Sequence, residues 1–552
     1  MRFAGRAFLA AVLAIALIAA ASAPAVAQAP AQVTGLKVRQ ADGFATLSWT
    51  PVAGATDYQI ERTLAGTPLG TGVVVGVWRP NRQINQDSPA FADAGFNPGD
   101  SFQWRVRARF GTEPQPYSEP VTGTTQPEFG DPGTPGENLR TQWEESNAAT
   151  YTSDVNEYAY TATLDAASKR VRVVEIGRTV LGRPINMFII GHPAPRPTVR
   201  AISNHPTALL NCNVHGNEPS SREGCLIMAR ELAFSKDPRT LDLLSNMNVL
   251  IVPAINGDGR AANSRGNSTG QDLNRDHSLL RQPETFALAA MVRDYSPEIA
   301  YDGHEFGNSQ AGDLPTLWPR HLNVAESVMG QSKDLIEDWL YTNGSEDGWW
   351  YCPYGCQNGG AVGLSQETIL RNTMGLKNTV SMLLEARSSG GTTRPSEAIP
   401  ANNRRRKTYS AIYTMGQMLD YYRANRPAIV ESIEQSVEFQ RSNTGRVVFR
   451  GSYDVPAFPA PHPGEAPPPD EPAEGVIDPP PCGYQLTSEQ LASTQDGSRS
   501  AADRLAAHGI KVQSRGPKGF FVPMAQPLRG LIPLLLDGEA AEPMVAGQRV
   551  GC

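Results

Sequence analysis

The sequence predicts an α/β domain in the middle of the chain, with an all-β module before it and a small unit after it. Three observations lead to this fold class. The chain has 552 residues, which is too long for one hydrophobic core. The middle part alternates apolar strand candidates with helical patterns, whereas residues 31–126 contain only short alternating runs between turn residues. Segments rich in proline and glycine separate these parts.

Composition and charge favour a globular protein that does not bind nucleic acid. Hydrophobic residues make up 40% and charged residues 19%, which is typical of globular proteins. The 49 Lys and Arg against 56 Asp and Glu give a net charge of −7, without a basic block. Nucleic acid is therefore not expected as a partner.

Residues 1–27 are predicted to be a signal peptide. Arg2 and Arg6 precede an apolar run over 8–21, and Ala-Val-Ala at 25–27 fits a cleavage site. A membrane anchor is the alternative, but the run is shorter than a membrane-spanning helix and no later segment is long and apolar enough. We therefore expect a secreted or periplasmic protein that is not inserted in a membrane.

The six cysteines fit an oxidising compartment, although six cysteines permit fifteen pairings. Proximity favours Cys352 with Cys356 and Cys482 with Cys552, which leaves Cys212 for Cys225. A zinc half-site at 352–356 is less favoured, because no second pair of ligands lies near it.

Residues 31–126 are predicted to form a β-sandwich. The segment resembles a fibronectin type III module, with Trp49 in TLSW, a strand at 58–62 and another at 102–110, where Phe102 takes the place of the usual tyrosine. Trp49 and Trp104 are expected in the core rather than in a ligand groove. The resemblance implies spacing or adhesion, such as contact with a cell wall or a protein. The expected strands are 33–38, 45–49, 58–62, 73–78 and 102–110.

A linker at 127–139 leads into an α/β domain at 140–440. Buried strands that alternate with helices indicate a sheet covered on both faces. The helical patterns are 219–235, 283–294 and 407–438. The strand candidates are 171–177, 185–191, 208–214, 247–255, 298–305 and 380–386.

A second linker is predicted at 456–481, where 11 of 26 residues are proline. The small unit at 482–552 is expected to be closed by the Cys482–Cys552 pair. It contains a helix-like stretch at 487–508 and strand-like runs at 519–524 (GFFVPM) and 531–536 (LIPLLL).

The first chemically informative stretch is NVHGNEPSSREG at 213–224. His215 and Glu218 lie three residues apart where a strand ends and a helix begins, the edge at which open α/β sheets bind ligands. Imidazole and carboxylate suit Zn²⁺, which needs a distant third ligand and an open position for water. Alone, such a pair can equally be a solvated surface turn.

Further polar residues follow other strands of the predicted sheet. His304 ends the strand of YDGHEFG (301–307), and Glu385 leaves the apolar run of SMLLEARSSGG (381–391). A carboxylate at the end of a buried strand is more often catalytic than structural. The loop after the strand at 247–255 adds Arg260, Arg265, Asp272, Asn274 and Arg275.

Because of these motifs, the segment 140–425 resembles the zinc carboxypeptidase family, the metallocarboxypeptidases related to pancreatic carboxypeptidases A and B. The motifs are HGNE, NGDGR with SRGN and DLNR, GHEFG and LLEARSSGG, in that order. The resemblance implies a mixed open sheet of about eight strands between helices and one catalytic zinc ion. It also implies cleavage of the C-terminal bond of a peptide or protein with a free C-terminus.

The resemblance implies a role for each metal-site residue. His215, Glu218 and His304 match the zinc ligands, and Asp272 matches the acceptor that orients His215. Glu385 resembles the general base and acid, which takes a proton from water and delivers it to the leaving nitrogen.

Three further residues match substrate contacts. Arg265 resembles the group that polarises the scissile carbonyl, although Arg260 could take its place. Asn274 and Arg275 would bind the terminal carboxylate. Leu370, in the region where the family reads the substrate side chain, is not an acid that would bind a basic residue, which favours apolar or neutral C-terminal residues.

The chain also departs from the family. The family's loop tyrosine has no clear counterpart, because Tyr351 and Tyr354 are nearby but 359–366 contains none. Glu305 follows a ligand on a strand and should point away from it, which suggests a supporting role. Fewer residues separate Glu218 from His304 in the sequence than in the pancreatic enzymes, which suggests rebuilt specificity loops. No motif matches the remaining histidines, His192, His205, His277, His321, His462 and His508.

The sequence thus favours a secreted zinc metallocarboxypeptidase. Two alternatives stay open. One is a zinc-dependent deacylase or peptidoglycan amidase on the same scaffold, which the short ligand spacing allows. The other is a non-catalytic wall- or protein-binding protein with a vestigial site.

Overall fold

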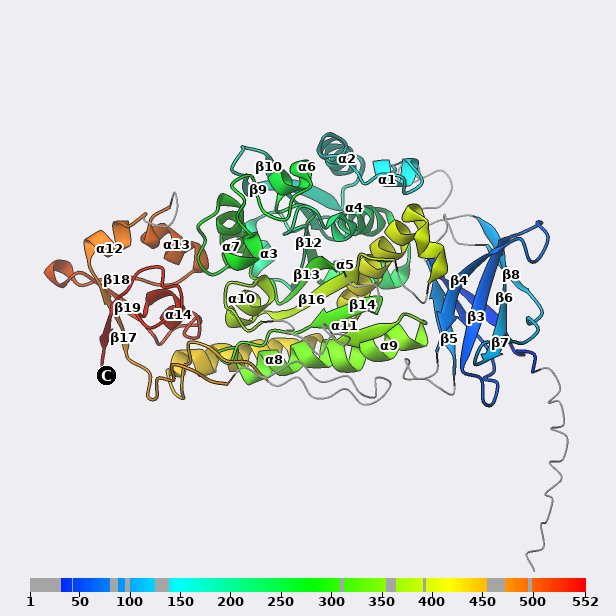
Figure 1. The fold of residues 1–552 in the computed structure, drawn as a ribbon. Helices are drawn as coiled ribbons and strands as arrows, with labels where there is room; N and C mark the ends of the chain where they lie inside the picture. The colour runs from blue at the N-terminus through cyan, green and yellow to red at the C-terminus, as the bar shows by residue number, and fades with distance from the viewer. Residues whose placement is uncertain are drawn as a thin grey trace, which may run out of the picture.

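The protein is seen here as a computed structural model that describes residues 31–41, 43–79, 88–94, 100–124, 139–307, 312–353, 364–390, 394–453, 472–494 and 499–552. The predicted signal peptide and residues 127–138 of the first predicted linker lie outside this described part, as do residues 456–471 of the second. Figure 1 shows a β-sheet module at one end, a large α/β body in the middle and a small unit at the other end.

The body is built on one mixed sheet of eight strands in the order β15-β14-β16-β13-β11-β12-β10-β9, as predicted. Strands β12, β11, β13 and β16 run parallel to one another. On one side β10 and β9 continue the sheet antiparallel, and on the other side β14 pairs antiparallel with β16. The strands are β9 (Val171–Arg178), β10 (Pro184–Ile190), β11 (Thr207–Cys212), β12 (Asn248–Val252), β13 (Ile299–Phe306), β14 (Leu314–Leu317), β15 (Tyr351–Pro353) and β16 (Val380–Arg387).

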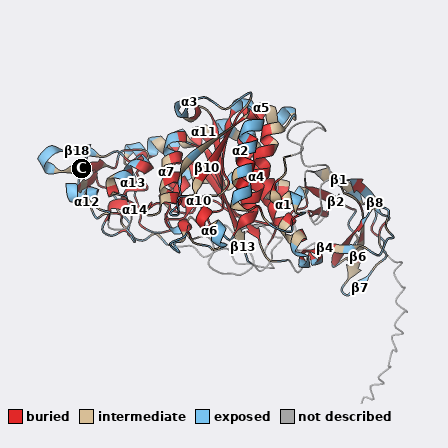
Figure 2. Ribbon diagram, turned by 90° about the horizontal axis from the view of Figure 1, so that it is seen from above, coloured by how far each residue is buried: buried red, intermediate tan, exposed pale blue. Residues whose placement is uncertain are grey.

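Helices cover both faces of the sheet because successive strand residues point to opposite sides. Leu210 belongs to the hydrophobic cluster that contains α4 (Pro219–Phe234) and α11 (Pro400–Ser442), whereas Leu209 belongs to the one that contains α7 (Pro283–Tyr295) and α10 (Leu370–Leu376). Helix α4 is buried along nearly its whole length (Figure 2).

The body contains further helices. They are α1 (Gln142–Glu145), α2 (Asp154–Ala167), α3 (Val199–Ser203), α5 (Pro238–Asn246), α6 (Gly257–Ala262), α8 (Glu326–Lys333) and α9 (Tyr341–Glu346), with a π-helix over Asp334–Leu340 and 3₁₀ turns at Leu273–Arg275 and Pro395–Ala398. None of the helices in the described residues is long and apolar enough to cross a bilayer.

The N-terminal module consists of two antiparallel sheets that enclose one core. Trp49 and Trp104 are buried in it, as expected, and the indole of Trp104 donates to Asp93 Oδ2 at 2.8 Å. The sheets are β1 (Lys37–Ala41), β2 (Phe44–Ser48) and β5 (Ala90–Asp93), and β3 (Asp57–Leu64), β4 (Val73–Trp78), β6 (Ser101–Phe110), β7 (Glu113–Pro114) and β8 (Val121–Thr124).

This module is docked on the body through β5. The N–H of Ala92 donates to the carbonyl of Gly348 at 2.9 Å, and the carbonyl of Ala92 accepts from Arg394 at 2.6 Å. The ring of Phe44 lies 5.2 Å from that of Trp349. The side of the module that contains β5 is therefore covered by the body.

Behind this contact lies a buried ion network at the end of β16. Arg387 pairs with Asp313 at 3.0 Å and with Glu397 at 2.7 Å. Arg394 pairs with the other oxygen of Asp313, and Arg406 with Glu397. Burial alone would raise the pKa of Asp313, but these guanidinium groups, led by Arg394, hold it below its usual value.

The C-terminal unit contains a small sheet in the order β18-β19-β17-β20. Its buried residues, such as Leu505 and Leu535, join the same hydrophobic cluster as α4 and α11. Within the predicted linker 456–481, Glu474 and Ile477 pair with Arg450 and Val447 of the body. Its elements are β17 (Gly483–Leu486), α12 (Ser488–Ala492), α13 (Ala501–His508), β18 (Gln513–Ser514), a 3₁₀ turn (Gly516–Lys518), β19 (Phe520–Pro523), α14 (Ile532–Leu536) and β20 (Gln548–Val550).

One strand prediction in this unit was wrong. The predicted strand-like run 531–536 (LIPLLL) contains the helix α14 (Ile532–Leu536) instead of a strand. The five residues of α14 are all buried, and a short run of apolar residues buried on every side has no period that separates strand from helix.

The buried network gives a stability prediction. Asp313→Asn removes a charge that compensates Arg387 and Arg394, and breaking a buried pair in this way costs about 3–5 kcal/mol. We expect a matching loss in the free energy of unfolding, measured with urea on the full chain. Arg239→Ala, which breaks an exposed pair with Asp237, should cost less than about 1 kcal/mol. Equal losses for both variants would contradict the network's role.

Candidate metal centre and active site

The segment that carries His215 and Glu218 is held in a tight turn between β11 and α4. Asn213 has φ +58°, a left-handed conformation that asparagine tolerates better than most residues. Its side-chain amide donates to the carbonyls of His215 at 2.8 Å and of Glu218 at 3.2 Å. A Cβ on Gly216 would lie 2.0 Å from the backbone of Gly259, so only glycine allows this close approach.

A disulfide closes the same turn. Cys212 at the end of β11 is joined to Cys225 in α4, as predicted, and Cys482 is joined to Cys552. The predicted Cys352–Cys356 pair lies outside the residues whose side chains are described. The first bridge spans the turn that carries both predicted ligands and therefore restrains it.

Strand pairing brings His304 to this turn. Strand β13 is parallel to β11, with Gly303 beside Cys212 in the ladder, so His304 follows directly beside the end of β11. The side chain of His304 is 1% exposed, and those of His215 and Glu218 are also nearly buried. The three predicted ligands thus meet at one sheet edge.

The ligand atoms of these side chains converge. Nδ1 of His215 lies 2.9 Å from Glu218 Oε1 and 3.0 Å from Nδ1 of His304, which lies 3.0 Å from Glu218 Oε2. Two atoms bound to one zinc ion at 2.0–2.1 Å in tetrahedral geometry are about 3.3 Å apart. The two imidazoles and the carboxylate therefore fit zinc in both chemistry and spacing.

A carboxylate lies within ion-pair distance of the far nitrogen of each imidazole. Nε2 of His215 lies 3.1 Å from Asp272 Oδ1, and Nε2 of His304 lies 3.1 Å from Asp302 Oδ1. Such partners orient the ring and leave Nδ1 for a metal ion. The sequence reasoning named Asp272 but missed Asp302. The sequence spacing could have revealed Asp302, because side chains two residues apart on a strand, such as 302 and 304 of β13, share one face of the sheet.

The charge state of the site also suits a cation. Burial would raise the pKa of Glu218, but hydrogen bonds from His215 and His304 outweigh it and lower this pKa to about 2. For Asp272, burial would also raise the pKa, but the interactions with His215 and Arg265 together outweigh it and lower this pKa. Both carboxylates are therefore ionised at neutral pH.

Glu385 lies beside this centre on the next strand. It is the ladder partner of His304 in the parallel pair of β13 and β16. Burial raises the pKa of Glu385 to about 7, although the charge of His304 acts in the opposite direction. The residue is half-buried, and its carboxylate has no hydrogen-bond partner among the described residues, so the group can exchange protons with a bound molecule.

Two arginines were candidates for the carbonyl-polarising role, and their positions differ. Arg265 Nη1 lies 3.2 Å from Nδ1 of His215, and its Nη2 binds Asp272 at 3.0 Å. Arg260 is turned away from the centre and donates to the carbonyl of Thr152 at 3.2 Å. The geometry therefore favours Arg265.

Asn274 and Arg275 follow Asp272 in a 3₁₀ turn beside the centre. Nδ2 of Asn274 lies 3.1 Å from Nε2 of His304, and its Oδ1 accepts from the N–H of Leu370 at 2.9 Å. Arg275 is exposed, and its guanidinium is folded onto the carbonyl of Asn274 at 2.8 Å. A free carboxylate can compete for this guanidinium.

The remaining candidates lie away from the centre or outside the description. Tyr351 is buried, and its hydroxyl accepts from Thr316 at 2.9 Å, so it belongs to the core. Tyr354 lies outside the described residues. Glu305 accepts from the N–H of Ser220 at 2.8 Å and pairs with Lys407, which is the supporting role expected of it.

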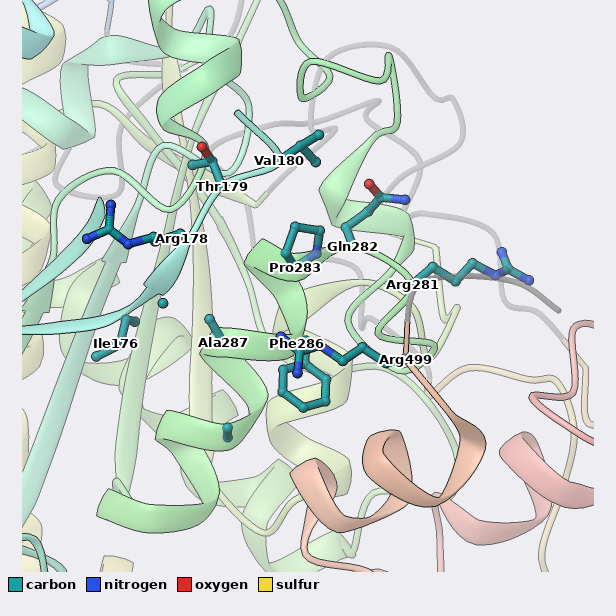
Figure 3. A pocket seen from close by; sticks show the side chains of 12 residues that line it. Ile176, Arg178, Thr179, Val180, Arg281, Gln282, Pro283, Phe286, Ala287 and Arg499 are labelled. Carbon is teal, nitrogen blue, oxygen red and sulfur yellow. The ribbon is translucent and has the colours of Figure 1, made fainter. Parts of the chain in front are cut away.

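A cavity of about 650 Å³ lies apart from these residues, between β9, the start of α7 and the C-terminal unit (Figure 3). None of the predicted site residues lines it. Its charged lining residues are already engaged, since Arg178 binds Glu175, Arg281 binds Glu542 and Arg499 stacks on Phe286. We therefore assign no ligand to it.

Comparison with known families now identifies this part of the chain. Residues 157–309 match the family model described as zinc carboxypeptidase. The chain carries a zinc carboxypeptidase domain. The residues that match the family model include His215, Glu218 and His304, but the match ends before Glu385.

The relatives of the zinc carboxypeptidase domain are carboxypeptidases. The chain is 27% identical over 262 residues to Carboxypeptidase 2 of Trichophyton tonsurans, covering 44% of this chain and 47% of that protein. It is 34% identical over 139 residues to Carboxypeptidase SOL1 of Arabidopsis thaliana, covering 23% and 27%. The chain thus spans about half the length of the first of these relatives.

Solved structures were compared as well. A metallo-carboxypeptidase from Burkholderia cenocepacia is 16% identical, with a TM-score of 0.38, and covers 70% of this chain and 93% of its own. A metallo-carboxypeptidase from Pseudomonas aeruginosa in complex with (2-guanidinoethylmercapto)succinic acid is 15% identical, with a TM-score of 0.38, and covers 70% and 90%.

The metal centre gives a second prediction. His304→Ala removes one ligand and should abolish stoichiometric zinc binding. Asp302→Asn keeps all ligands but weakens the orientation of the ring, so zinc affinity should fall about 10- to 100-fold. Competition with a chromophoric chelator measures both effects, and His205→Ala, in a histidine paired with Arg196, serves as the control. Unchanged affinity in Asp302→Asn would show that this carboxylate does not support the ligand.

Proposed function

We propose that this protein is a zinc metallocarboxypeptidase, which hydrolyses the C-terminal bond of peptides or proteins with a free C-terminus. The supporting observation is the convergence of Nδ1 of His215, the carboxylate of Glu218 and Nδ1 of His304 beside Glu385, the ladder partner of His304. The match to the zinc carboxypeptidase family and the carboxypeptidase relatives support the same function.

The proposed mechanism assigns the chemistry to these side chains. One zinc ion held by the three ligands would activate water and polarise the scissile carbonyl. Glu385 accepts the proton of the attacking water and delivers it to the leaving nitrogen. Arg265 donates hydrogen bonds to the carbonyl oxygen as negative charge develops on it.

Substrate binding is proposed for Asn274 and Arg275, which bind the terminal carboxylate, the arginine through paired hydrogen bonds. Leu370, whose N–H donates to Asn274, is itself apolar, and this favours an apolar or neutral C-terminal residue.

We further propose that the protein is secreted or periplasmic. The predicted signal peptide and the two disulfides of the described part support export to an oxidising compartment. The fibronectin-like module remains a predicted contact for a cell wall or a protein, through surface that the body leaves open.

The alternatives predict different results with defined substrates. A deacylase or peptidoglycan amidase would prefer N-acyl amino acids or cell-wall stem peptides to dipeptides. A non-catalytic binding protein would hydrolyse none of them, and the complete ligand set beside Glu385 argues against it.

Glu385→Gln tests the proton-transfer role. The substitution removes the base but no ligand, so zinc content should stay the same while kcat falls by about 10²- to 10⁴-fold. Metal analysis and peptide hydrolysis measure the two effects, with the exposed Glu326→Gln as the control. Substantial hydrolysis by zinc-loaded Glu385→Gln would assign the base elsewhere.

Arg275→Ala tests the binding of the carboxylate. Loss of charge-assisted hydrogen bonds worth about 1.5–3 kcal/mol should lower kcat/KM about 10- to 150-fold for a peptide with a free C-terminus. Residual cleavage of the same peptide with an amidated C-terminus should change little. An equal fall for the two peptides would mean that Arg275 does not bind the carboxylate.

A further inference from the structure

The loop that follows Asn274 and Arg275 has a backbone conformation that needs support from its surroundings. This loop, residues 276–282, joins the 3₁₀ turn of the two residues to α7. Within it, Leu280 is fully buried and has φ +54°. A residue other than glycine is strained in this left-handed region and persists there only where neighbouring contacts hold it.

Asp276 holds the loop from the inside. Its carboxylate accepts the N–H groups of Arg281 at 3.0 Å and of Gln282 at 2.8 Å. Its carbonyl accepts the N–H of Leu279 at 3.1 Å. These bonds hold the loop together from within, but they do not involve the carbonyls of Ser278 and Leu279.

The C-terminal unit supplies donors for these two carbonyls from α13. His508 Nε2 donates to the carbonyl of Ser278 at 2.7 Å, and Arg504 Nη1 donates to the carbonyl of Leu279 at 3.1 Å. Both donors are buried, with 3% and 1% of the residue exposed. Figure 1 shows α13 next to α7 at the border of the two parts.

The contact of His508 is a neutral hydrogen bond. Because a carbonyl only accepts, the ring carries a hydrogen on Nε2. Burial, with the charge of Lys377 acting in the same direction, lowers the pKa of His508, so the ring is uncharged at neutral pH. Next to it, Ala507 packs against Leu280 and Ala289 in one apolar cluster.

We propose that the C-terminal unit is a working part of the substrate site, in which His508 and Arg504 are positioning residues. By binding the backbone of the loop 276–282 they fix where Asn274 and Arg275 stand. The inference rests on the proposed function and extends it: a unit outside the matched family range sets the strength of carboxylate binding.

The test compares variants at 508 that differ in hydrogen bonding. His508→Leu removes the donor, whereas His508→Gln can place an amide N–H near the position of Nε2. Arg504→Met removes the second donor, and the exposed Lys518→Ala is the control within the same unit. Each variant is made in the full zinc-loaded chain and compared by kcat, KM, zinc content and hydrogen exchange of residues 276–282.

Because carboxylate binding acts equally on the bound substrate and the transition state, its loss raises KM rather than lowering kcat. We expect KM for a free-acid peptide to rise about five- to tenfold in His508→Leu and Arg504→Met, with kcat and zinc content nearly unchanged. Exchange of 276–282 should become faster in both. In His508→Gln, KM should stay close to the wild-type value, and Lys518→Ala should behave as wild type.

The outcomes separate this inference from the proposed function. Wild-type protein that hydrolyses peptides, together with unchanged KM and exchange in both donor variants, would overturn the inference alone. Equal defects in His508→Leu and His508→Gln would reduce the contact to general packing and also overturn it. If wild type hydrolyses no peptide, the proposed function fails, and the exchange measurement still decides whether the C-terminal unit holds the loop. If His508→Leu does not fold, KM and hydrogen exchange are compared between Arg504→Met, which lacks one donor, and His508→Gln, which keeps one.

Discussion

The site depends on the in-register parallel pairing of three neighbouring strands. Cys212 lies beside Gly303 in the ladder of β11 and β13, and His304 lies beside Glu385 in that of β13 and β16. Because parallel strands end at one edge, residues far apart in sequence reach one point there. A slip of one residue in β13 would turn His304 to the other face of the sheet and remove it from the centre.

Much of this arrangement could be predicted from the sequence, because the strands are short apolar runs and the ligands follow them directly. Asp302 was missed although its spacing from His304 placed it on the same face. The helix at 531–536 was missed because burial on all sides erases the periodic signal. The role of His508 carried no local signal at all, since its partner Ser278 lies 230 residues away. Local pattern predicts elements and their ends, whereas contacts between distant loops emerge only from packing.

Both flanking parts of the chain are packed against the body. In the N-terminal module, the carbonyl of Ala92 accepts from Arg394 of the body. Arg394 belongs to the buried ion network that also contains Arg387, two residues after Glu385. The C-terminal unit binds the loop after Arg275 through His508 and Arg504. The proposed base and the proposed carboxylate clamp are thus each supported by a part of the chain outside the sheet that carries them.

The central claim is that two imidazoles and one carboxylate bind a single zinc ion. Zinc K-edge X-ray absorption of the zinc-loaded full chain tests this most directly. The account predicts a four-coordinate site at about 2.0–2.1 Å with scattering from two imidazoles, the remaining ligands being oxygen. Zinc coordinated by sulfur, or by a number of imidazoles other than two, would contradict it.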